Sequence, residues 1–330
     1  TGSVWSSMDN VINGKKGNQN KLLEHYPLKF GKREEIDLSL YNPNYPSRYY
    51  SNPNGQLWIG DAIEWLKTLD SGSIDLVFAD PPYNIKKAEW DTFESQQEYV
   101  KWSCKWIEEV ARVLKPEGTF YICGFSEILA DIKLPASRLF KGCRWIIWHY
   151  LNKANLGNDW GRSHESILHF RKSRKFTFNI DDIRIPYGQH TLKYPGHPHA
   201  ETSQYCNGLK KGHLWMPHPK GAKPKDVMEI PTTSNSMPEK TPHPTQKPEE
   251  LLRKIILVSS NPGDLIVDPF VGSGTTAVVC EQLKRRWLGC DINHEYLDWA
   301  INRLENIPSL SVDQWMRIDF ENAQRRKSIR

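Results

Sequence analysis

Long hydrophobic runs are absent from this sequence of 330 residues. No stretch approaches the roughly 18 consecutive apolar residues that predict a membrane-spanning helix, and the start of the sequence lacks the apolar core of a signal peptide. Hydrophobic residues make up 38% of the chain and charged residues 25%, as in ordinary globular proteins. The composition therefore predicts a cytoplasmic protein of one large domain or two ordinary ones, without a membrane partner.

Closely spaced cysteine pairs are also missing. Several cysteines lie in apolar runs, which favours buried free thiols in a reducing compartment over a disulfide framework. The histidines around residues 197–218 match no standard spacing of metal ligands, and loop or phosphate contacts explain them better, so no metal is predicted. The six cysteines are Cys104, Cys123, Cys143, Cys206, Cys280 and Cys290, and the histidines in question are His197, His199, His213 and His218.

Two familiar nucleotide-binding motifs are incomplete. A glycine-rich turn follows Asp268, but no Gly-Lys-Ser/Thr comes after it, so the turn is not a Walker A loop. Ala277 stands where the dinucleotide fingerprint has its third glycine, although this replacement does not by itself exclude NAD. An aspartate at the tip of a strand disfavours a bound pyrophosphate. It suits a cationic donor that carries a sulfonium and an amino group.

Strands and helices are predicted to alternate along most of the sequence. Short apolar runs predict strands, and longer runs with apolar residues every three or four positions predict helices. This alternation is typical of a mainly parallel sheet of the α/β class. Strands are expected at 57–59, 74–79, 119–123, 145–148, 166–170, 265–267 and 287–290, and helices at 62–69, 96–114, 248–260, 275–283 and 295–305.

The first group of residues that points to chemistry joins the glycine-rich turn to a later acid. Gly272 and Gly274 lie between a predicted strand and a predicted helix, where small residues let a ligand approach the backbone. Asp291 ends the next strand and can accept hydrogen bonds from ribose hydroxyls. The glycines alone also fit a packing role. Their place between a strand, a helix and a second strand that ends in an acid predicts a nucleoside site.

The second group is Asp80-Pro81-Pro82-Tyr83, directly after a buried strand. The prolines fix φ at about −65° and remove two amide donors, so this backbone offers acceptors. Asp80 and the Pro81 carbonyl can accept both N–H bonds of an exocyclic amino group, and the Tyr83 ring can stack on a base. For the tetrapeptide alone, a rigid turn with a helix-capping aspartate is the simpler alternative.

A locally basic segment separates the two groups. Residues 171–242 contain 12 Lys or Arg against 6 Asp or Glu, with five His, which suits contact with phosphates. Residues 186–242 have little periodicity and are too many for an ordinary connection, so we expect a functional insert. A plain solvated face would carry the same charge. The aromatic residues of the insert fit either base contacts or local packing, and they are Tyr187, Tyr194, Tyr205 and Trp215.

Together these features resemble the DNA amino-methyltransferases of restriction-modification systems, which modify adenine N6 or cytosine N4. Asp80 to Tyr83 match the family's motif IV, D/S/N-P-P-Y/F/W. Phe270-Val-Gly272-Ser-Gly274 match the F-x-G-x-G core of motif I. His243-Pro-Thr-Gln-Lys247-Pro resembles motif X, which precedes motif I. The combination of motifs is far more specific than any one of them.

Two shorter matches extend the resemblance over about residues 57–305. Gly60-Asp61-Ala62 resembles the segment that helps to hold the adenine of the donor, and His164-Glu165 lies where the family has motif VIII. The resemblance implies S-adenosyl-L-methionine as the cofactor. The implied catalytic residues are Asp80, Pro81, Pro82 and Tyr83, and the implied cofactor-binding residues are Asp61, Ala62, Asp80, Lys247, Asp268, Phe270, Gly272, Ser273, Gly274, Thr275 and Asp291.

The order of the motifs is that of the family's β group, with the catalytic loop before the donor-binding turn. This implies a Rossmann-like methyltransferase fold, a mainly parallel sheet with helices on both faces, and a target-recognition insert. The implied parts are an extension at 1–50, the catalytic part at 51–170, the target-recognition region at 171–242, the donor-binding part at 243–310 and a tail at 311–330.

The resemblance implies direct transfer of a methyl group to adenine N6 in double-stranded DNA, after the base is flipped out of the helix. Asp-Pro-Pro-Tyr is the commoner form among adenine enzymes, and cytosine N4 is the alternative. An amino group on RNA or protein, or a non-catalytic DNA- or nucleoside-binding protein of this fold, are further alternatives. No cysteine follows the paired prolines, which argues against cytosine-C5 chemistry. Such prokaryotic cytoplasmic systems allow a homodimer and a cognate restriction endonuclease as partners.

Overall fold

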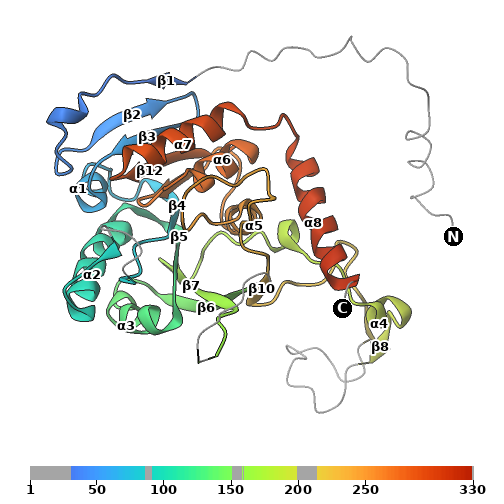
Figure 1. Cartoon of the computed structure of the whole chain (residues 1–330). Coiled ribbons are helices and arrows are strands. Elements are labelled where there is room, and N and C mark those ends of the chain that lie inside the picture. The colour runs from blue at the N-terminus through green and yellow to red at the C-terminus, as the bar shows by residue number, and fades with distance from the viewer. Residues whose placement is uncertain (1–30, 86–90, 151–157, 159, 199–213, 329–330) are drawn as a thin grey trace, which may run out of the picture. The chain divides into compact units, whose positions relative to one another are not determined.

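The computed structural model describes residues 31–85, 91–150, 158, 160–198 and 214–328, and its centre is one sheet of ten strands. The strands lie in the order β1-β2-β3-β12-β11-β4-β5-β7-β6-β10 (Figure 1). Their bounds are β1 Lys32–Arg33, β2 Ser47–Ser51, β3 Gly55–Ile59, β4 Ile74–Ala79, β5 Leu114–Gly124, β6 Gly142–His149, β7 His164–Arg171, β10 Val227–Glu229, β11 Leu265–Asp268 and β12 Arg286–Asp291.

The middle of the sheet is parallel. β3, β12, β11, β4 and β5 follow one another with parallel pairing throughout. Beyond β5 the direction reverses, because β7 pairs antiparallel with both β5 and β6. The carboxyl ends of the parallel strands therefore share one edge of the sheet, and the amino end of β7 reaches the same edge. The predicted mainly parallel α/β sheet is confirmed.

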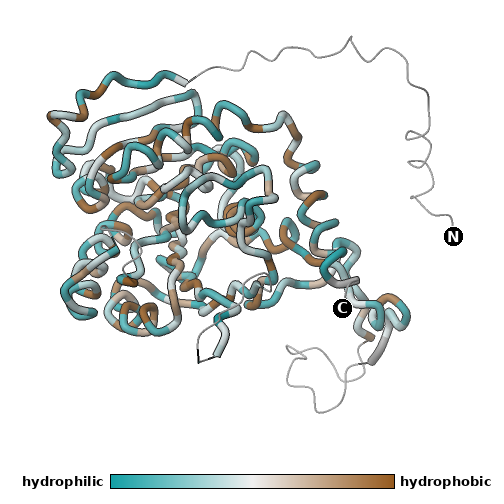
Figure 2. Tube along the Cα trace, viewed as in Figure 1, coloured by the Kyte–Doolittle hydropathy of each residue, from teal (hydrophilic) through white to brown (hydrophobic). Residues whose placement is uncertain are grey.

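Helices cover both faces of this sheet. Along β4 the side chains alternate between two hydrophobic clusters, since Leu76 and Phe78 belong to one and Val77 and Ala79 to the other. The first cluster takes in α5, α6 and α7, and the second takes in α1, α2 and α3. Figure 2 shows hydrophobic stretches around α5 and the neighbouring strands. The helix bounds are α1 Ala62–Lys67, α2 Gln96–Val113, α3 Ser126–Ala136, α5 Glu249–Ser259, α6 Thr275–Gln282, α7 His294–Glu305 and α8 Val312–Ser328.

All the strands and helices predicted from the sequence are present, with small shifts at their ends. Helix α2 begins after Ser95, whose side chain accepts from the Glu98 amide as an N-cap. It ends at Val113, and the chain enters β5 at once. Residues 115–118, with Pro116 and Gly118, therefore lie inside the first part of β5, beside a shift of register between Ile74 and Leu76.

Several elements were not predicted, among them β2, α3 and α8. Strand β2 lies in the segment interpreted as an extension, of which residues 31–50 are described and docked. Its Tyr49 and Tyr50 are buried in the core. Helix α3 contains Pro135 in its last turn, a residue that predicts an end rather than a helix. The part boundaries at residues 50, 170, 242 and 310 stay predictions.

The described part of the basic insert has little regular structure. It contains the short helices η3 (Ile180–Ile183) and α4 (Gln189–Lys193) and a small hairpin of β8 (His197–Pro198) and β9 (Leu214–Trp215). Strand β10 returns the chain to the sheet, where it pairs parallel with β6. Residues 199–213, with Tyr205 and Cys206, lie outside the described residues, and the role of the insert stays a prediction.

Neither a membrane-spanning helix nor a cluster of metal ligands occurs among the described residues. Within them, no helix combines the length and the apolar character needed to cross a bilayer. Likewise, no three His, Cys, Asp or Glu side chains in this part of the chain come together as a metal site. The described cysteines carry free thiols, and Cys123, Cys280 and Cys290 are buried. Of the histidines considered as ligands, His199 and His213 lie outside the described residues.

Helix α8 is attached to α5 by a buried ion pair. The Arg253 guanidinium donates to both carboxylate oxygens of Asp319, at 2.9 and 2.8 Å, and lies over the Trp315 ring. Asp319→Ala would leave the Arg253 charge buried without this partner. We expect a loss of about 3–5 kcal/mol in the free energy of unfolding, measured by urea denaturation.

An exposed ion pair on the same helix provides the control. Arg317 and Glu321 lie 2.9 Å apart, with side chains 77% and 42% exposed. Glu321→Ala is expected to change the free energy of unfolding by about 0.5 kcal/mol or less, because solvent screens such pairs. Equal effects of Asp319→Ala and Glu321→Ala would show that the buried pair does not hold α8 in place.

Candidate functional site

Four neighbouring strands deliver acidic residues to the same edge of the sheet. Asp80 follows β4, Asp268 ends β11, Asp291 ends β12, and Asp61 lies two residues after β3. In α/β proteins ligands bind outside the carboxyl ends of the strands. A cavity of about 270 Å³ lies at this position. The acids at its wall come from sequence positions far apart, which the parallel pairing brings together.

The predicted site residues gather around this one cavity, with a single exception. All four predicted catalytic residues line it, and so do ten of the eleven predicted cofactor-binding residues. Gly274 does not reach the cavity wall. The predicted residues that line the cavity are Asp61, Ala62, Asp80, Pro81, Pro82, Tyr83, Lys247, Asp268, Phe270, Gly272, Ser273, Thr275 and Asp291. Their chemical roles stay predictions.

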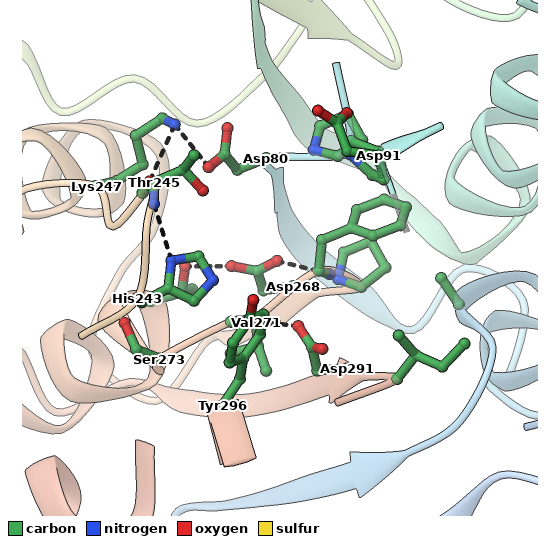
Figure 3. Close-up of a pocket in the computed structure, with 18 of the residues that line it drawn as sticks. Asp80, Asp91, His243, Thr245, Lys247, Asp268, Val271, Ser273, Asp291 and Tyr296 are labelled. Carbon is green, nitrogen blue, oxygen red and sulfur yellow. Dashed lines mark hydrogen bonds and ion pairs between the residues drawn. The ribbon is translucent and has the colours of Figure 1, made fainter. Parts of the chain in front are cut away.

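Asp80 is the centre of a buried polar cluster. Its Oδ2 accepts from the Lys247 ammonium at 2.6 Å (Figure 3), and its Oδ1 accepts from the Tyr83 hydroxyl at 2.6 Å. Burial raises the pKa of the Asp80 carboxyl, although the Lys247 ammonium opposes the rise. Burial also disfavours the charge on Lys247, but the carboxylates of Asp80 and Glu165 outweigh it and raise the pKa of the ammonium.

Hydrogen bonds to the Asp91 carboxylate hold the backbone of the loop that follows Asp80. The Asp91 carboxylate accepts from the backbone amides of Tyr83, Asn84 and Ile85, at 2.6, 2.7 and 3.2 Å. These bonds fix the backbone around Asn84, which has a φ of 57° in the left-handed region. Nothing in the sequence predicted this role for Asp91, because the contacts depend on the fold of the intervening residues.

The two proline carbonyls of the loop differ in their surroundings. The Pro82 carbonyl accepts from the Tyr99 hydroxyl of α2, at 2.7 Å. The Pro81 carbonyl accepts no hydrogen bond from any described residue, and Pro81 lines the cavity. The arrangement therefore keeps one carbonyl acceptor for a ligand, next to the Asp80 carboxylate.

The other end of the cavity contains two carboxylates, the buried Asp268 and the partly buried Asp291, and no Lys or Arg among the described residues is bonded to either. Asp268 accepts from the Phe270 amide at 3.0 Å and from the Thr276 hydroxyl at 2.5 Å. Asp291 accepts from the amides of Gly272 and Asn293, both at 2.9 Å. Burial raises the pKa of Asp268 to about 7 and that of Asp291 to about 6. Buried acids of this kind attract a positively charged ligand.

The turn after β11 depends on two glycines for different reasons. A side chain at Gly272 would lie 3.0 Å from Nε2 of His243, whose ring also meets Tyr296 edge-on at the cavity wall. Burial lowers the pKa of His243 to about 3, so this ring is neutral. Gly274 has a φ of 80° and lies against Ala300 of α7. Gly274 thus serves helix packing rather than the cavity wall.

The segment that precedes α5 closes one side of the cavity. The Thr275 hydroxyl donates to the Lys247 carbonyl at 3.2 Å, and the Arg303 guanidinium binds the Ser273 carbonyl and the Thr275 hydroxyl. The Gln246 side chain accepts from Thr241, through both the backbone amide and the hydroxyl. These bonds connect the segment resembling motif X to the turn resembling motif I, and so fix the direction of the Lys247 side chain.

Several residues of the site were not predicted. Trp102 and Trp106 lie four residues apart on α2 and therefore on one face of that helix. Trp106 is fully buried, but Trp102 lines the cavity and packs against Phe270. Helical spacing identifies a shared face and cannot show where that face meets a cavity. The other missed residues are Phe93, Asp91 and Tyr296, whereas His243 and Glu165 lay in the segments resembling motifs X and VIII without a role assigned to them.

The residues present fit S-adenosyl-L-methionine well. The carboxylates of Asp268 and Asp291 suit its positive charges and hydroxyl groups, and the rings of Trp102, Phe93 and Phe270 give an apolar wall for its adenine. Oδ1 of Asp61 accepts from the first amides of α1, at 2.9 and 3.0 Å, so this acid also shapes the wall. The cavity is therefore suited to a cationic nucleoside.

Comparison with known proteins agrees with this chemistry. A family model described as DNA methylase matches residues 74–302. Type II methyltransferase M.HpaI of Haemophilus parainfluenzae is 38% identical over 258 residues, covering 76% of this chain and 74% of that protein. The DNA adenine methyltransferase YhdJ of Escherichia coli (strain K12) is 35% identical over 264 residues, covering 78% and 85%.

Solved structures show the same fold. The cytosine-N4-specific PvuII DNA methyltransferase matches 83% of this chain and 94% of its own, with a TM-score of 0.58 and 19% identity. The predicted family and its methyl donor, S-adenosyl-L-methionine, are confirmed, since the family model covers most of the chain and relatives above 30% identity cover three quarters of it. The chain belongs to the N6/N4 family of DNA methylases.

Proposed function

We propose that this protein transfers a methyl group from S-adenosyl-L-methionine to the exocyclic N6 of adenine in double-stranded DNA. The observation that carries the proposal is that one cavity has amino-group acceptors at one end and, at the other, two carboxylates that no described cation pairs with. S-adenosyl-L-methionine supplies a methyl group activated by a sulfonium when it is bound. The protein's part is to hold both reactants in line and to accept hydrogen bonds.

The catalytic end acts on a base flipped out of the duplex. Asp80 and the Pro81 carbonyl each accept one N–H bond of the amino group, which directs the nitrogen lone pair towards the donor end of the cavity. The Tyr83 ring stacks on the base. Lys247, 2.6 Å from Asp80, favours the ionised form of the acceptor and opposes the rise that burial causes in its pKa. No covalent bond between enzyme and base is needed, so orientation and electrostatic preorganisation supply most of the rate gain.

Adenine is favoured over cytosine by one relative. YhdJ, with its 35% identity over most of this chain, is described as a DNA adenine methyltransferase. The Asp-Pro-Pro-Tyr form of the loop supports the same choice. Cytosine N4 is the second candidate, because the family acts on both amino groups. A homodimer, a cognate restriction endonuclease and a cytoplasmic location stay predictions.

Sequencing with modification-sensitive reads tests the proposal directly. DNA is taken from cells that express the protein and from cells that express the Asp80→Ala variant. N6-methyladenine at one recurring sequence, present only with the unaltered protein, is the expected result. Detection of N4-methylcytosine instead of N6-methyladenine would favour the second candidate, methylation of cytosine N4. Methylation of RNA or protein but not of DNA would overturn the proposal, and failure to bind the donor would indicate a non-catalytic protein.

Donor binding should weaken as the pH falls. Burial raises the pKa of Asp268 to about 7 and of Asp291 to about 6, so both are ionised at about pH 8 and largely protonated at about pH 5. A cationic donor favours the ionised forms, so each carboxyl that is protonated in the free protein must lose its proton when the donor binds. Below the pKa of such a group, this lowers the affinity about tenfold per pH unit for each group. We expect the dissociation constant, measured by calorimetry, to rise at least about 10-fold between pH 8 and pH 5.5.

The demethylated product provides a matched control for this pH dependence. S-adenosyl-L-homocysteine lacks the sulfonium charge and keeps the nucleoside and the amino acid. Its dissociation constant should change less over the same range of pH. Equal changes for both ligands would contradict an interaction between the two carboxylates and the sulfonium.

A further inference from the structure

A fourth side chain, Glu165, joins Asp80, Lys247 and Tyr83 in the cluster and is the third charged member. Glu165 is the second residue of β7, which runs antiparallel to β5 and therefore begins at the catalytic edge of the sheet. Its Oε2 lies 3.1 Å from the Tyr83 hydroxyl and 3.4 Å from the Lys247 ammonium. The Glu165 side chain is 12% exposed and that of Lys247 is 6% exposed. Two carboxylates, one ammonium and one hydroxyl thus form a closed, buried ring.

The Tyr83 hydroxyl lies within reach of both carboxylates. It is 2.6 Å from Oδ1 of Asp80 and 3.1 Å from Oε2 of Glu165. A tyrosine hydroxyl carries one hydrogen, so it donates to one of them at a time. Both acceptors are reached by rotation of the hydroxyl alone. The ring can therefore keep its position, and with it the surface offered to a base.

In the free protein both carboxylate oxygens of Asp80 accept a hydrogen bond, Oδ2 from Lys247 and Oδ1 from Tyr83. An incoming amino group must approach one of these oxygens, where it competes with the donor already bound there. Lys247 is the harder partner to displace, since it is an ammonium held at 2.6 Å from a buried carboxylate, and its backbone carbonyl is fixed by Thr275. The Tyr83 hydroxyl is the partner that can leave.

We propose that Glu165 is a positioning residue that takes over the Tyr83 hydroxyl when the base enters, and so frees Oδ1 of Asp80 for the amino group. The exchange replaces one hydrogen bond to a carboxylate with another. Without Glu165 a buried bond to a charged group would be broken without replacement, or Tyr83 would stay on Asp80 and block the acceptor. This inference rests on the proposed function of the same cavity.

The test compares four variants in a single-turnover methylation of duplex DNA with saturating donor. Glu165→Leu removes the acceptor and keeps most of the side-chain volume, and we expect a rate about 10- to 100-fold lower, the range for an unreplaced hydrogen bond to a charged group. Glu165→Gln keeps an acceptor oxygen and should stay within about fivefold of the unaltered protein. Tyr83→Phe has no hydroxyl to move.

The double variant gives the decisive result. In the Tyr83→Phe background nothing occupies Oδ1 of Asp80, so the further change Glu165→Leu should leave the rate of Tyr83→Phe unchanged. A purely structural role of Glu165 would instead slow the double variant by the same factor as Glu165→Leu alone. That additive result would overturn the proposal, and so would a Glu165→Leu variant as fast as the unaltered protein.

The proposed function is tested separately within the same experiment. An unaltered protein that fails to methylate DNA would overturn the function before any variant is compared. Calorimetric titration with the donor checks that each variant is folded, since Glu165 does not line the donor cavity. If Glu165→Leu fails to fold, the comparison of Glu165→Gln with a Glu165→Ala variant measures the same loss of an acceptor and decides the question.

Discussion

Asp80→Ala is expected to abolish methyl transfer while leaving the donor bound. Asp80 lines the cavity next to Pro81, whose carbonyl accepts no hydrogen bond from the described residues. Removing it takes away one of the two acceptors that orient the amino nitrogen. Losing a single preorganised partner of the reacting group lowers kcat by about 10²–10³-fold in comparable sites. Asp80→Ala also removes the negative charge that faces Lys247, which adds to this effect. We expect at least a 10³-fold loss.

Donor binding should survive because Asp268 and Asp291 lie at the other end of the cavity. We expect the dissociation constant of S-adenosyl-L-methionine to change by less than about tenfold, since Asp80 adds only a long-range charge. Single-turnover transfer of a labelled methyl group measures the first effect and calorimetry the second. Substantial methylation by Asp80→Ala would refute the role assigned to this residue.

Two matched variants separate chemistry from folding. Asp80→Asn keeps an acceptor oxygen of the same size, so it should retain measurable transfer where Asp80→Ala has none. Asp70→Ala removes an exposed carboxylate from the loop before β4 and should behave as the unaltered protein. Loss of a buried partner also destabilises Lys247, so the unfolding of each variant is measured beside its activity.

The meeting of Asp80, Asp268 and Asp291 could be predicted from the sequence. Each of these acids ends or follows a short apolar run, and such runs become neighbouring parallel strands whose carboxyl ends share an edge. The motifs then identified the two ends of the cavity. This part of the site depends only on local pattern and on the topology that such patterns favour.

The remainder of the site depends on long-range geometry that local pattern does not contain. Glu165 reaches Asp80 because β7 runs antiparallel to β5 in one particular register, which the hydrophobic pattern of either strand leaves open. Asp91 holds the loop across residues whose path no periodicity predicts. Trp102 shares its helical face with Trp106, and only the packing of α2 decides which of them meets the cavity.

The unpredicted helix α8 illustrates a related limit. Its sequence is polar for most of its length, so its apolar contacts are few and its helical period is weak. The helix is held by Trp315 and by ion pairs with α5, of Asp319 with Arg253 and of Arg326 with Glu250. Ion pairs of this kind leave no periodic signal in a sequence. The segment was therefore interpreted as a tail.

Gly274→Ala is expected to destabilise the protein and to remove donor binding together. Gly274 has a φ of 80°, and a Cβ there would lie 2.6 Å from Cβ and 3.0 Å from Cα of Ala300 in α7. The left-handed backbone costs a residue with a side chain about 1–2 kcal/mol, and overpacking against a helix adds about 1–3 kcal/mol. We expect a total loss of about 3 kcal/mol in the free energy of unfolding.

Donor binding should fall with stability because α7 carries part of the cavity. Tyr296 lies on the same helix as Ala300 and lines the cavity beside His243. If α7 moves outward by the few tenths of an ångström or more that the new methyl group demands, this wall and the turn at Gly272 move with it. We expect the dissociation constant of S-adenosyl-L-methionine to rise at least about tenfold, because small displacements in a preorganised site reduce affinity strongly.

Gly263→Ala separates backbone strain from the clash with α7. Gly263 has a φ of 84°, similar to that of Gly274, but nothing lies within 4 Å of its added Cβ. Alanine at this position should therefore cost only the strain of about 1 kcal/mol and leave donor binding unchanged. Urea denaturation and calorimetry of both variants test the difference. If the two alanine variants lose equal stability and both bind the donor, the close packing of Gly274 against Ala300 does not shape the donor site.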